Sequence, residues 1–419
     1  MSSLFKIATV NNISKVGLKR FPKNLYKIGA LDNEIKKPVA LLLRSHKLKN
    51  EQVDESISAI ARCGAGTNNI PIDKMSNRGI PVFNTPGANA NSVKELVLCS
   101  LFLSARNITG AINHIQDLTE SKGFKYAGER VEKDKKLFAG TEIKGKTLGV
   151  IGLGAIGSQV AMAGASLGMK VIGYDPQLTI DAAWNLNGGK VKRVNDIENC
   201  ISNADYISLH VPFIKDITEN LIDSDMINIM KPNASLLNFS RSELVDHSSL
   251  IEAMNCGKFN GKYCTDFPNE IIQGHKQCIT IPHLGASTKE AEDNSASMAA
   301  DTIMNFLESG TIKNSVNFPT TLPKKRKSNT TRFCIVNKNK SGVLMNINNL
   351  LFEYGLNVDQ QINTSREELA YNVIDVDSIL DSNEFKDLHN QFEKLDGVLS
   401  VRIISGENYN QQSFYTKNT

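Results

Sequence analysis

The chain has 419 residues, 41% of them hydrophobic and 22% charged, which predicts two to four globular domains in an ordinary folded protein. The net charge of +4 is spread along the chain, and this argues against nucleic acid as a main partner. No uninterrupted apolar run reaches about 18 residues and the N-terminus lacks a secretory pattern, so we expect no membrane span and no signal peptide. The seven cysteines are scattered and form no C-x-x-C pair, which predicts a reducing, cytoplasmic compartment and no metal site.

Short apolar runs alternate with helical patterns over most of the chain. Runs at 39–43 and 80–84 predict buried strands, and apolar residues at helical spacing predict a buried helix over 92–105. A second series begins at residue 146, and its expected strands are 147–151, 170–174, 206–211, 235–239, 262–267 and 278–281. Strands that alternate with helices predict an α/β fold of doubly wound parallel sheets.

The C-terminal quarter has a different pattern. Residues 311–330 contain two prolines and the basic run 324–327, show little periodicity and are expected to form a linker. The segment 331–406 follows the order strand, helix, strand, strand, helix, strand. This order predicts a ferredoxin-like βαββαβ domain, after which 407–419 is expected to be a tail.

A glycine-rich turn follows the expected strand 147–151. Gly152 allows the tight turn, Gly154 lets the backbone approach a pyrophosphate, and Gly157 lets the next helix pack closely on the strand. The free N–H groups of that helix would face the phosphates. Asp175 ends the next strand, where a carboxylate binds ribose hydroxyls and repels a 2′-phosphate. The motif therefore predicts NAD as the cofactor.

Three residues past later strands offer the groups that hydride transfer from an alcohol requires. Arg241 is a cation suited to a carboxylate and a forming carbonyl, His283 is a base for the hydroxyl proton, and Glu270 is a carboxylate partner for that base. Ligands of open parallel sheets bind at the carboxyl ends of the strands, where all three residues are expected. The sequence therefore predicts a dehydrogenase site.

The motifs 149–157, 209–212, 238–241 and 282–288 together resemble the D-isomer-specific 2-hydroxyacid dehydrogenases, and the resemblance runs over nearly all of 35–405. It is strongest toward the members that act on D-3-phosphoglycerate. The resemblance implies NAD-dependent oxidation of D-3-phosphoglycerate to 3-phosphohydroxypyruvate, the entry step of L-serine synthesis. It also implies two lobes, a flavodoxin-like substrate-binding domain (1–105 and 285–310) and a Rossmann-like NAD-binding domain (106–284).

The same resemblance assigns roles to individual residues. Arg241 would bind the substrate carboxylate and carbonyl, His283 would be the general base for oxidation, and Glu270 would pair with His283 and stabilise its protonated form. The implied NAD contacts are Gly152, Gly154, Ala155, Ile156, Gly157, Asp175, Val211, Pro212, Phe239, Ser240, Asp266, Gly285 and Ala286. The implied substrate contacts are Arg44, Ser45 and Gly66, with Arg44 as the candidate for the phosphate.

Some features depart from the family pattern. Ser242 follows Arg241 where relatives usually have glycine, and the 13-residue spacing of Glu270 and His283 is shorter than in many relatives. The register leaves Thr265 and Asp266 both open as the nicotinamide contact, and we select Asp266. Two rival functions follow from the same residues, a glyoxylate or hydroxypyruvate reductase of this family and a non-catalytic NAD-sensing protein.

Segments 337–344, 355–358 and 397–403 resemble the ACT domain. The resemblance implies edge-to-edge pairing of two copies, and therefore a homo-oligomer, either a dimer or a tetramer. It also implies an amino-acid effector, L-serine, with Asn339 and Asn357 at the ligand-contacting positions. Asn337 stands where a histidine is frequent and Ser341 replaces the usual proline, so a purely oligomerising domain is the alternative.

Overall fold

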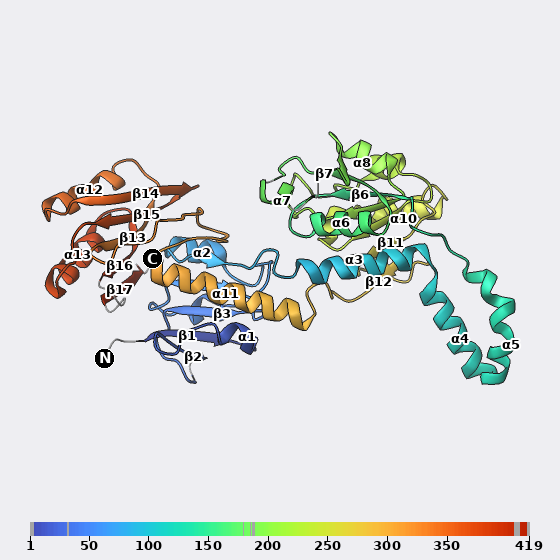
Figure 1. The fold of residues 1–419 in the computed structure, drawn as a ribbon, viewed down its shortest axis with the longest axis horizontal. Coiled ribbons are helices and arrows are strands. Elements are labelled where there is room, and N and C mark those ends of the chain that lie inside the picture. The colour runs from blue at the N-terminus through green and yellow to red at the C-terminus, as the bar shows by residue number, and fades with distance from the viewer. Residues whose placement is uncertain are drawn as a thin grey trace. The chain divides into compact units, whose positions relative to one another are not determined.

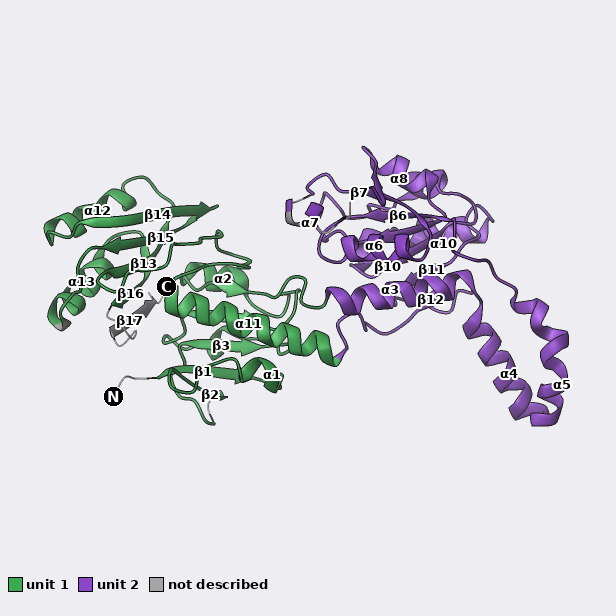
Figure 2. Ribbon diagram, in the orientation of Figure 1, with its two compact units in different colours: residues 1–89, 289–419 green, residues 90–288 purple. Residues whose placement is uncertain are grey.

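The computed structural model describes residues 4–31, 33–178, 180–184, 186, 189–405 and 411–416. The chain divides into two compact units (Figure 2). Unit 1 contains Met1–Asn89 and Lys289–Thr419, and unit 2 contains Ala90–Thr288. The predicted substrate-binding lobe and the C-terminal domain thus share one unit, whereas the predicted NAD-binding lobe lies in the other.

Unit 1 contains a parallel sheet with the order β2-β1-β3-β4-β5 (Figure 1). Its strands are β1 (Phe5–Val10), β2 (Tyr26–Ala30), β3 (Ala40–Leu43), β4 (Ala59–Arg62) and β5 (Val82–Phe83). Its helical segments are α1 (Lys15–Leu18), the 3-10 turn η1 (Asn50–Gln52), α2 (Ile72–Asn77) and α11 (Lys289–Ser309). Leu42 belongs to the same core cluster as Ile303 of α11, whereas Leu41 and Leu43 belong to the cluster of Met75 in α2. Because both faces of the sheet are covered, β3 is apolar at every position.

The second sheet of unit 1 is antiparallel, with the order β14-β15-β13-β16-β17. Its elements are β13 (Thr331–Lys338), α12 (Val343–Glu353), β14 (Val358–Arg366), β15 (Leu369–Val376), α13 (Ser382–Lys394), β16 (Val398–Ser405) and β17 (Gln411–Thr416). The first six elements have the predicted βαββαβ order. The prediction of a tail over 407–419 needs correction, because β17 pairs with β16 within this segment. Residues 406–410 and 417–419 lie outside the described residues.

Strands β13, β15 and β16 of the antiparallel sheet are covered on both faces, whereas β14 is exposed or partly buried. One face shares a cluster with α12 and α13, and the other shares a cluster with α11 and the parallel sheet. Residues Ile312 and Phe318 of the predicted linker are buried in the second cluster. The linker prediction therefore needs correction, since 311–330 contains side chains that join the lobe to the C-terminal domain.

Three side chains of the antiparallel sheet hold the C-terminal end of α11. Arg332 Nη1 donates to the Ser309 carbonyl at 2.7 Å, Arg402 Nη1 donates to the Leu307 carbonyl at 2.6 Å, and the Tyr371 hydroxyl donates to the Gly310 carbonyl at 2.8 Å. Arg332 is fully buried and forms an ion pair with Asp375 at 2.6 Å. The last carbonyls of a helix have no partners within the helix, so these donors satisfy them.

Unit 2 contains a parallel sheet with the order β12-β11-β10-β9-β6-β7-β8. Its strands are β6 (Thr147–Ile151), β7 (Lys170–Tyr174), β8 (Val191–Arg193), β9 (Tyr206–Leu209), β10 (Ser235–Asn238), β11 (Tyr263–Thr265) and β12 (Cys278–Thr280). Its helical segments around the sheet are α3 (Ala90–Ala105), α6 (Gly157–Ser166), α7 (Ile180–Trp184), α8 (Ile197–Asn203), α9 (Ser224–Ile229), η3 (Ser242–Leu244) and α10 (His247–Asn255). The sheet confirms the predicted doubly wound α/β class.

Helix α3 changes the predicted domain boundary. The prediction assigned residues up to 105 to the substrate-binding domain, but Val93, Val97 and Leu101 share a core cluster with Val150 of β6. Unit 2 therefore begins at Ala90 and ends at Thr288 rather than running from 106 to 284. The apolar face of α3 is covered by the NAD-binding lobe, which the helical periodicity alone does not specify.

A helical hairpin extends from the sheet of unit 2 (Figure 1). It consists of α4 (Ile108–Lys122), α5 (Phe124–Asp134) and the 3-10 turn η2 (Lys135–Phe138). Asp134 joins its two helices, because it accepts hydrogen bonds from His114 of α4 and Arg130 of α5. No single helix among the described residues has the length and apolar character of a membrane span; only α3 and α4 taken together, across a bend of 67°, pass that test.

Candidate active site

The glycine turn of unit 2 has the shape that a dinucleotide requires. Gly152 has φ of 88°, and a Cβ there would lie 2.7 Å from the His210 carbonyl. A Cβ at Gly157 would lie 1.9 Å from the Gly152 carbonyl oxygen. A Cβ at Gly154 would meet nothing within 4 Å, and the neighbouring Ala155 is exposed. The turn therefore packs tightly against the protein at two glycines and is open at the third, where a pyrophosphate would approach.

Asp175 is fixed beside the glycine turn by backbone donors. Its Oδ2 accepts from the Leu153 N–H at 2.8 Å and its Oδ1 accepts from the Gln177 N–H at 2.8 Å. A carboxylate has about four lone-pair sites, so acceptor capacity remains for ribose hydroxyls. Asp175 also follows β7, which lies next to β6 in the sheet. This geometry fits the predicted role of Asp175 in NAD binding.

The remaining predicted NAD contacts follow the strands on the other side of β6. Val211 and Pro212 follow β9, and Phe239 and Ser240 follow β10. Ser240 Oγ donates to the Leu209 carbonyl at 2.7 Å, which links the loop after β10 to the end of β9. Adjacent strands in this sheet are parallel, so their carboxyl ends meet at one edge. The structure therefore brings the glycine turn and these loops to the same edge of the sheet.

Asp266 is the buried carboxyl group of this edge. It is 1% exposed, and its Oδ2 accepts from the Gly285 N–H at 3.1 Å. Its Oδ1 is buried without a hydrogen-bond partner among the described residues. Burial raises the pKa of Asp266, and the nearby His283 partly lowers it. The Thr265 hydroxyl, by contrast, already accepts a hydrogen bond from the Phe267 N–H at 3.1 Å. The geometry therefore favours Asp266 over Thr265 as the acceptor for a donor such as a nicotinamide carboxamide.

The three predicted catalytic residues lie on the loops after β10, β11 and β12. Arg241 is exposed and its Nη1 donates to its neighbour's carbonyl, that of Ser240, at 2.6 Å. Glu270 and His283 are also exposed. Neighbouring parallel strands carry these loops, so all three face the same edge of the sheet as Asp266.

The predicted pair of Glu270 and His283 is not formed in this conformation. Among the described residues no hydrogen bond or ion pair joins them, and the His283 ring packs edge-on against Phe267 with centroids 4.8 Å apart. Both side chains are exposed on turns, where solvent competes for the carboxylate. The carboxyl group whose pKa responds to His283 is Asp266, which the prediction had assigned to NAD alone. Pairing of Glu270 with His283 stays a prediction.

The predicted substrate contacts lie in unit 1, at the carboxyl ends of β3 and β4. Arg44 Nη1 forms an ion pair with Glu292 Oε1 at 2.6 Å, and its side chain is 36% exposed. Ser45 Oγ accepts from Asn11 Nδ2 at 3.3 Å. Gly66 lies in the turn after β4. The ion pair holds the candidate phosphate-binding cation at this edge of the sheet.

Arg62 is a second cation at this edge that the sequence analysis did not select. Its Nε donates to the Arg44 carbonyl at 3.2 Å. A Cβ at Gly64 would lie 2.6 Å from Arg62 Nη1, so the guanidinium lies over the glycine-rich turn. The signal in the sequence was the position of Arg62, the last residue of β4 directly before that turn. Arg44 and Arg62 thus lie at the ends of the neighbouring strands β3 and β4, and guanidinium groups suit a phosphate dianion.

The two predicted effector residues both make hydrogen bonds within the C-terminal domain. Asn339 Nδ2 donates to the Glu367 carbonyl at 3.1 Å, and Asn357 Nδ2 donates to Asp377 Oδ2 at 2.7 Å. The first bond joins the loop after β13 to the turn between β14 and β15, and the second joins the residue before β14 to the residue after β15. In the part of the chain that the structure describes, no group of three or more His, Cys, Asp or Glu side chains could hold a metal ion.

Comparisons with known proteins agree with this geometry. Residues 108–285 match the family model of the D-isomer specific 2-hydroxyacid dehydrogenase, NAD binding domain. The chain is 30% identical to the D-3-phosphoglycerate dehydrogenase of Dictyostelium discoideum, over 95% of this chain and 97% of that protein. It is 31% identical to the D-3-phosphoglycerate dehydrogenase of Haemophilus influenzae, over 87% of this chain and 86% of that protein.

Among solved structures, the NAD⁺-bound 3-phosphoglycerate dehydrogenase of Entamoeba histolytica matches with a TM-score of 0.57 at 26% identity, over 75% of this chain and 99% of that chain. The holo D-mandelate dehydrogenase of Rhodotorula graminis has a TM-score of 0.62 at 20% identity, over 77% and 99% of the two chains, and shows the same fold. The chain therefore belongs to the D-isomer-specific 2-hydroxyacid dehydrogenase family. It is an NAD-dependent oxidoreductase, and the relatives that match it over most of their length are D-3-phosphoglycerate dehydrogenases.

Proposed function

We propose that the chain oxidises D-3-phosphoglycerate to 3-phosphohydroxypyruvate with NAD⁺, the first step of L-serine biosynthesis. The observation that carries the proposal is the edge of the unit 2 sheet, where the glycine turn, Arg241, the buried Asp266 and His283 follow parallel strands. Arg44 and Arg62, at the ends of the neighbouring strands β3 and β4 in unit 1, support a phosphorylated substrate. The names of the relatives support the same substrate.

In this proposal the side chains of the site have distinct tasks. Arg241 binds the substrate carboxylate and stabilises the negative charge that develops on the C2 oxygen. An imidazole nitrogen of His283 accepts the hydroxyl proton while the C2–H bond breaks and the C2 carbonyl forms. The bound NAD⁺ supplies the hydride acceptor. Asp266 orients the nicotinamide through its unpaired Oδ1, and Glu270 stabilises the imidazolium once the turns bring the two side chains together.

The test is NADH oxidation with 3-phosphohydroxypyruvate, compared with hydroxypyruvate and glyoxylate. We expect the phosphorylated ketoacid to have the highest kcat/KM. His283→Ala should lower kcat by about a hundredfold or more with NADH binding intact. Higher kcat/KM with glyoxylate or hydroxypyruvate would identify a reductase for those acids instead. NADH binding without turnover of any of the three would identify a non-catalytic NAD-sensing protein.

For regulation, we propose that L-serine binds the C-terminal domain at Asn339 and Asn357. The ferredoxin-like order of its elements and its unbroken core with the substrate-binding lobe support this role. Isothermal titration of the full chain with L-serine is the test. Heat that is lost in Asn357→Ala would support the site, and no heat with the unaltered chain would discard it.

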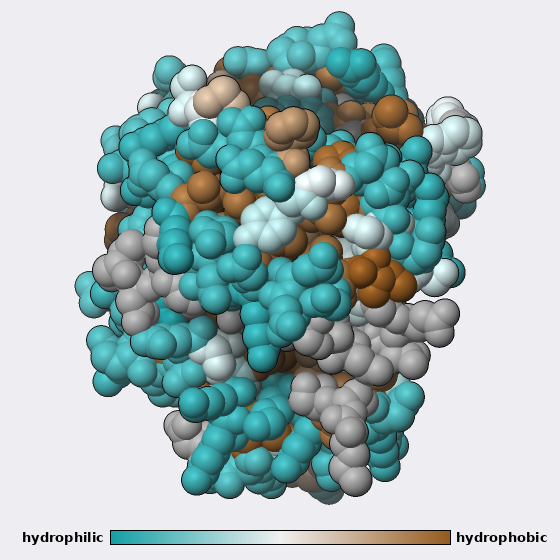
Figure 3. Space-filling view, turned by 90° about the vertical axis from the view of Figure 1, so that its left-hand side faces the viewer, coloured by the Kyte–Doolittle hydropathy of each residue, from teal (hydrophilic) through white to brown (hydrophobic). Residues whose placement is uncertain are grey.

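For assembly, we propose a homodimer or homotetramer in which the α4–α5 hairpin is one interface. Ile108, Ile112 and Ile115 recur at helical spacing on α4 and are 43%, 51% and 37% exposed. By contrast, the face of unit 1 seen in Figure 3 is mostly hydrophilic, with hydrophobic side chains in small separate patches. Light scattering should give at least twice the chain mass, and Ile112→Glu should lower it. An unchanged mass would remove the hairpin from the interface.

We propose a cytoplasmic location, as the free state of all seven cysteines supports. Cell fractionation tests it. Recovery of the protein from a secreted or membrane fraction would contradict it.

A further inference from the structure

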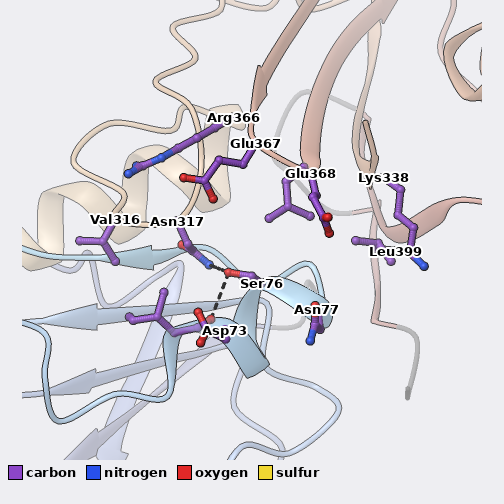
Figure 4. A pocket seen from close by; sticks show the side chains of 12 residues that line it. Asp73, Ser76, Asn77, Val316, Asn317, Lys338, Arg366, Glu367, Glu368 and Leu399 are labelled. Atoms are coloured by element: carbon purple, nitrogen blue, oxygen red, sulfur yellow. Dashed lines mark hydrogen bonds between the residues drawn. The ribbon is translucent and has the colours of Figure 1, made fainter. Parts of the chain in front are cut away.

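A cavity of about 490 Å³ lies within unit 1, between the parallel-sheet lobe and the C-terminal domain (Figure 4). One wall comes from α2 and residues 316–317, and the other comes from the end of β13, the turn between β14 and β15, and the start of β16. The volume lies within the range of about 300–1,000 Å³ that small-molecule sites occupy. No residue assigned above to NAD, substrate or L-serine lines it.

The wall on the lobe side is held by one buried amide. Asn317 Oδ1 accepts from the Val82 N–H at 2.8 Å, and its Nδ2 donates to the Ile80 carbonyl at 3.0 Å and to Ser76 Oγ at 3.1 Å. These bonds fix α2 and residue 317 to strand β5. The wall therefore has a defined shape before any ligand binds.

The opposite wall is a turn that the C-terminal domain holds in an uncommon conformation. Glu367 has φ of 55°, in the left-handed region. The Asn339 N–H donates to the Glu368 carbonyl at 2.7 Å, and Asn339 Nδ2 donates to the Glu367 carbonyl. At the margin of the cavity, Ser400 Oγ donates to the Gly79 carbonyl of the lobe at 3.2 Å. Because the backbone of the turn is tied to Asn339, its charged side chains are presented toward the lobe (Figure 4).

Charges of both signs line the cavity. Asp73, Glu367 and Glu368 are acidic, and Lys338 and Arg366 are basic, which leaves a net charge of 2 − 3 = −1. None of the five takes part in an ion pair between residues that the structure describes. The five side chains are exposed, so each single attraction to a ligand is weak. A ligand that carries both charges can engage several of them together.

We propose that this cavity binds a small α-amino acid with a cationic side chain. Its carboxylate would lie at Arg366, whose guanidinium can donate two parallel hydrogen bonds, because Lys338 lies on the opposite side of the cavity (Figure 4). Its ammonium group and side-chain cation would lie at Asp73 and the two glutamates, and its net charge of +1 would balance the cavity. Its methylene groups would pack on the apolar part of the wall, which includes Leu399. The proposal does not depend on the catalysed reaction.

A ligand at this site would contact the lobe and the C-terminal domain at the same time. It would therefore stabilise their junction, in the way that any ligand stabilises the state to which it binds. L-arginine is the probe that we select, because it carries a carboxylate and two cations. Spermidine carries only cations, and inorganic phosphate carries only negative charge, so these two probes separate the proposed class from simple ion binding.

The experiment is isothermal titration of the full chain, with a thermal melt as the second measurement. L-arginine should bind with a Kd of about 1 mM or below, as few weak contacts allow. Asp73→Asn and Arg366→Gln should each weaken binding by about threefold, and the double variant by about tenfold. Glu353→Gln is the matched control, since it removes an exposed carboxylate of the C-terminal domain outside the cavity, and it should bind L-arginine as the unaltered chain does.

Four outcomes would overturn the proposal. They are no binding of L-arginine at about ten times the expected Kd, equal binding by the double variant, equal binding of spermidine, and equal binding of phosphate. Melting of each variant without ligand reports whether it folds. If the double variant unfolds, the two single variants decide the question, because each retains one wall of the cavity unchanged.

Discussion

The two parallel sheets of this chain prepare their carboxyl edges in different ways. In unit 2 the edge has open space at Gly154, where a Cβ would meet nothing within 4 Å, and a buried Asp266 oxygen without a partner among the described residues. In unit 1 the cation proposed to bind the phosphate already has a partner, because Arg44 is paired with Glu292. A cofactor can therefore complete the first edge by adding contacts, whereas a phosphorylated substrate must displace a carboxylate at the second. Cofactor binding at the first edge should therefore respond to the gain or loss of single atoms, whereas substrate binding at the second edge should respond to a change of charge.

The largest expected effect is that of a methyl group in the glycine turn. Gly157→Ala would place a Cβ 1.9 Å from a backbone oxygen, so the turn or α6 must move. We expect a loss of about 3 kcal/mol in the free energy of unfolding, together with loss of NADH binding. Thermal melting and NADH fluorescence titration measure the two effects. Gly154→Ala is the control, because its Cβ meets nothing within 4 Å, and it should melt as the unaltered chain does.

The next effect concerns the unpaired oxygen of Asp266. In Asp266→Asn the amide oxygen can still accept from the Gly285 N–H, but an NH₂ group then replaces the free acceptor. We expect NADH binding to weaken by about tenfold, which is the cost of one lost acceptor. Fluorescence titration is the measurement. Unchanged affinity would show that the cofactor does not use this oxygen.

The same variant tests the pH dependence of stability. Burial raises the pKa of Asp266 above its ordinary value of 3.8, so the folded state binds the proton more tightly than the unfolded state. Protonated Asp266 makes its full contribution to the free energy of unfolding below pH 3.8, and this contribution is lost as the pH rises through the raised pKa. The unaltered chain without NAD should therefore lose stability relative to Asp266→Asn as the pH rises above 3.8. Denaturant unfolding at several pH values would contradict this if the difference were constant.

The smallest effect should appear at the edge of unit 1. Glu292→Gln removes the carboxylate that competes with a phosphate for Arg44. We expect KM for 3-phosphohydroxypyruvate to fall by about threefold, the range of an exposed ion pair, with KM for hydroxypyruvate unchanged. Asp301→Asn is the matched control, because it breaks the pair with Arg20 elsewhere on α11. Equal changes for both ketoacids would show that Arg44 does not contact the phosphate.

Much of the fold was predictable because its strands carry clear local signals. Strands β6 and β7 have the predicted bounds, since a buried apolar run and a glycine turn define them. Strand β8 was missed because its residues are only partly buried or exposed. The hairpin α4–α5 was also missed, since α4 has no buried residue to give a core-facing pattern. The domain boundary depends on which lobe covers α3, and this is a tertiary contact that local periodicity does not encode.

The local geometry of the site was easier to predict from the sequence than its contacts between loops. Gly152, Gly154 and Asp175 have geometry that fits their predicted roles, because a turn and a strand end position them locally. The neighbours of His283 depend on how the loops after β11 and β12 fold, and here they place Phe267 against its ring rather than Glu270. Long-range packing decides such contacts, so a motif cannot specify them.

Helix α11 gives the C-terminal domain a further importance. The helix starts where unit 2 ends, lies on the parallel sheet, and depends on Arg332, Tyr371 and Arg402 for the donors at its other end. A chain truncated at residue 330 would leave those carbonyls bare and would expose the apolar flank of the helix to water. In this chain the domain therefore supplies both hydrogen-bond donors and apolar cover to a helix of the parallel-sheet lobe. Loss of the domain would therefore be felt in the folding of the parallel-sheet lobe of unit 1, and not only in regulation.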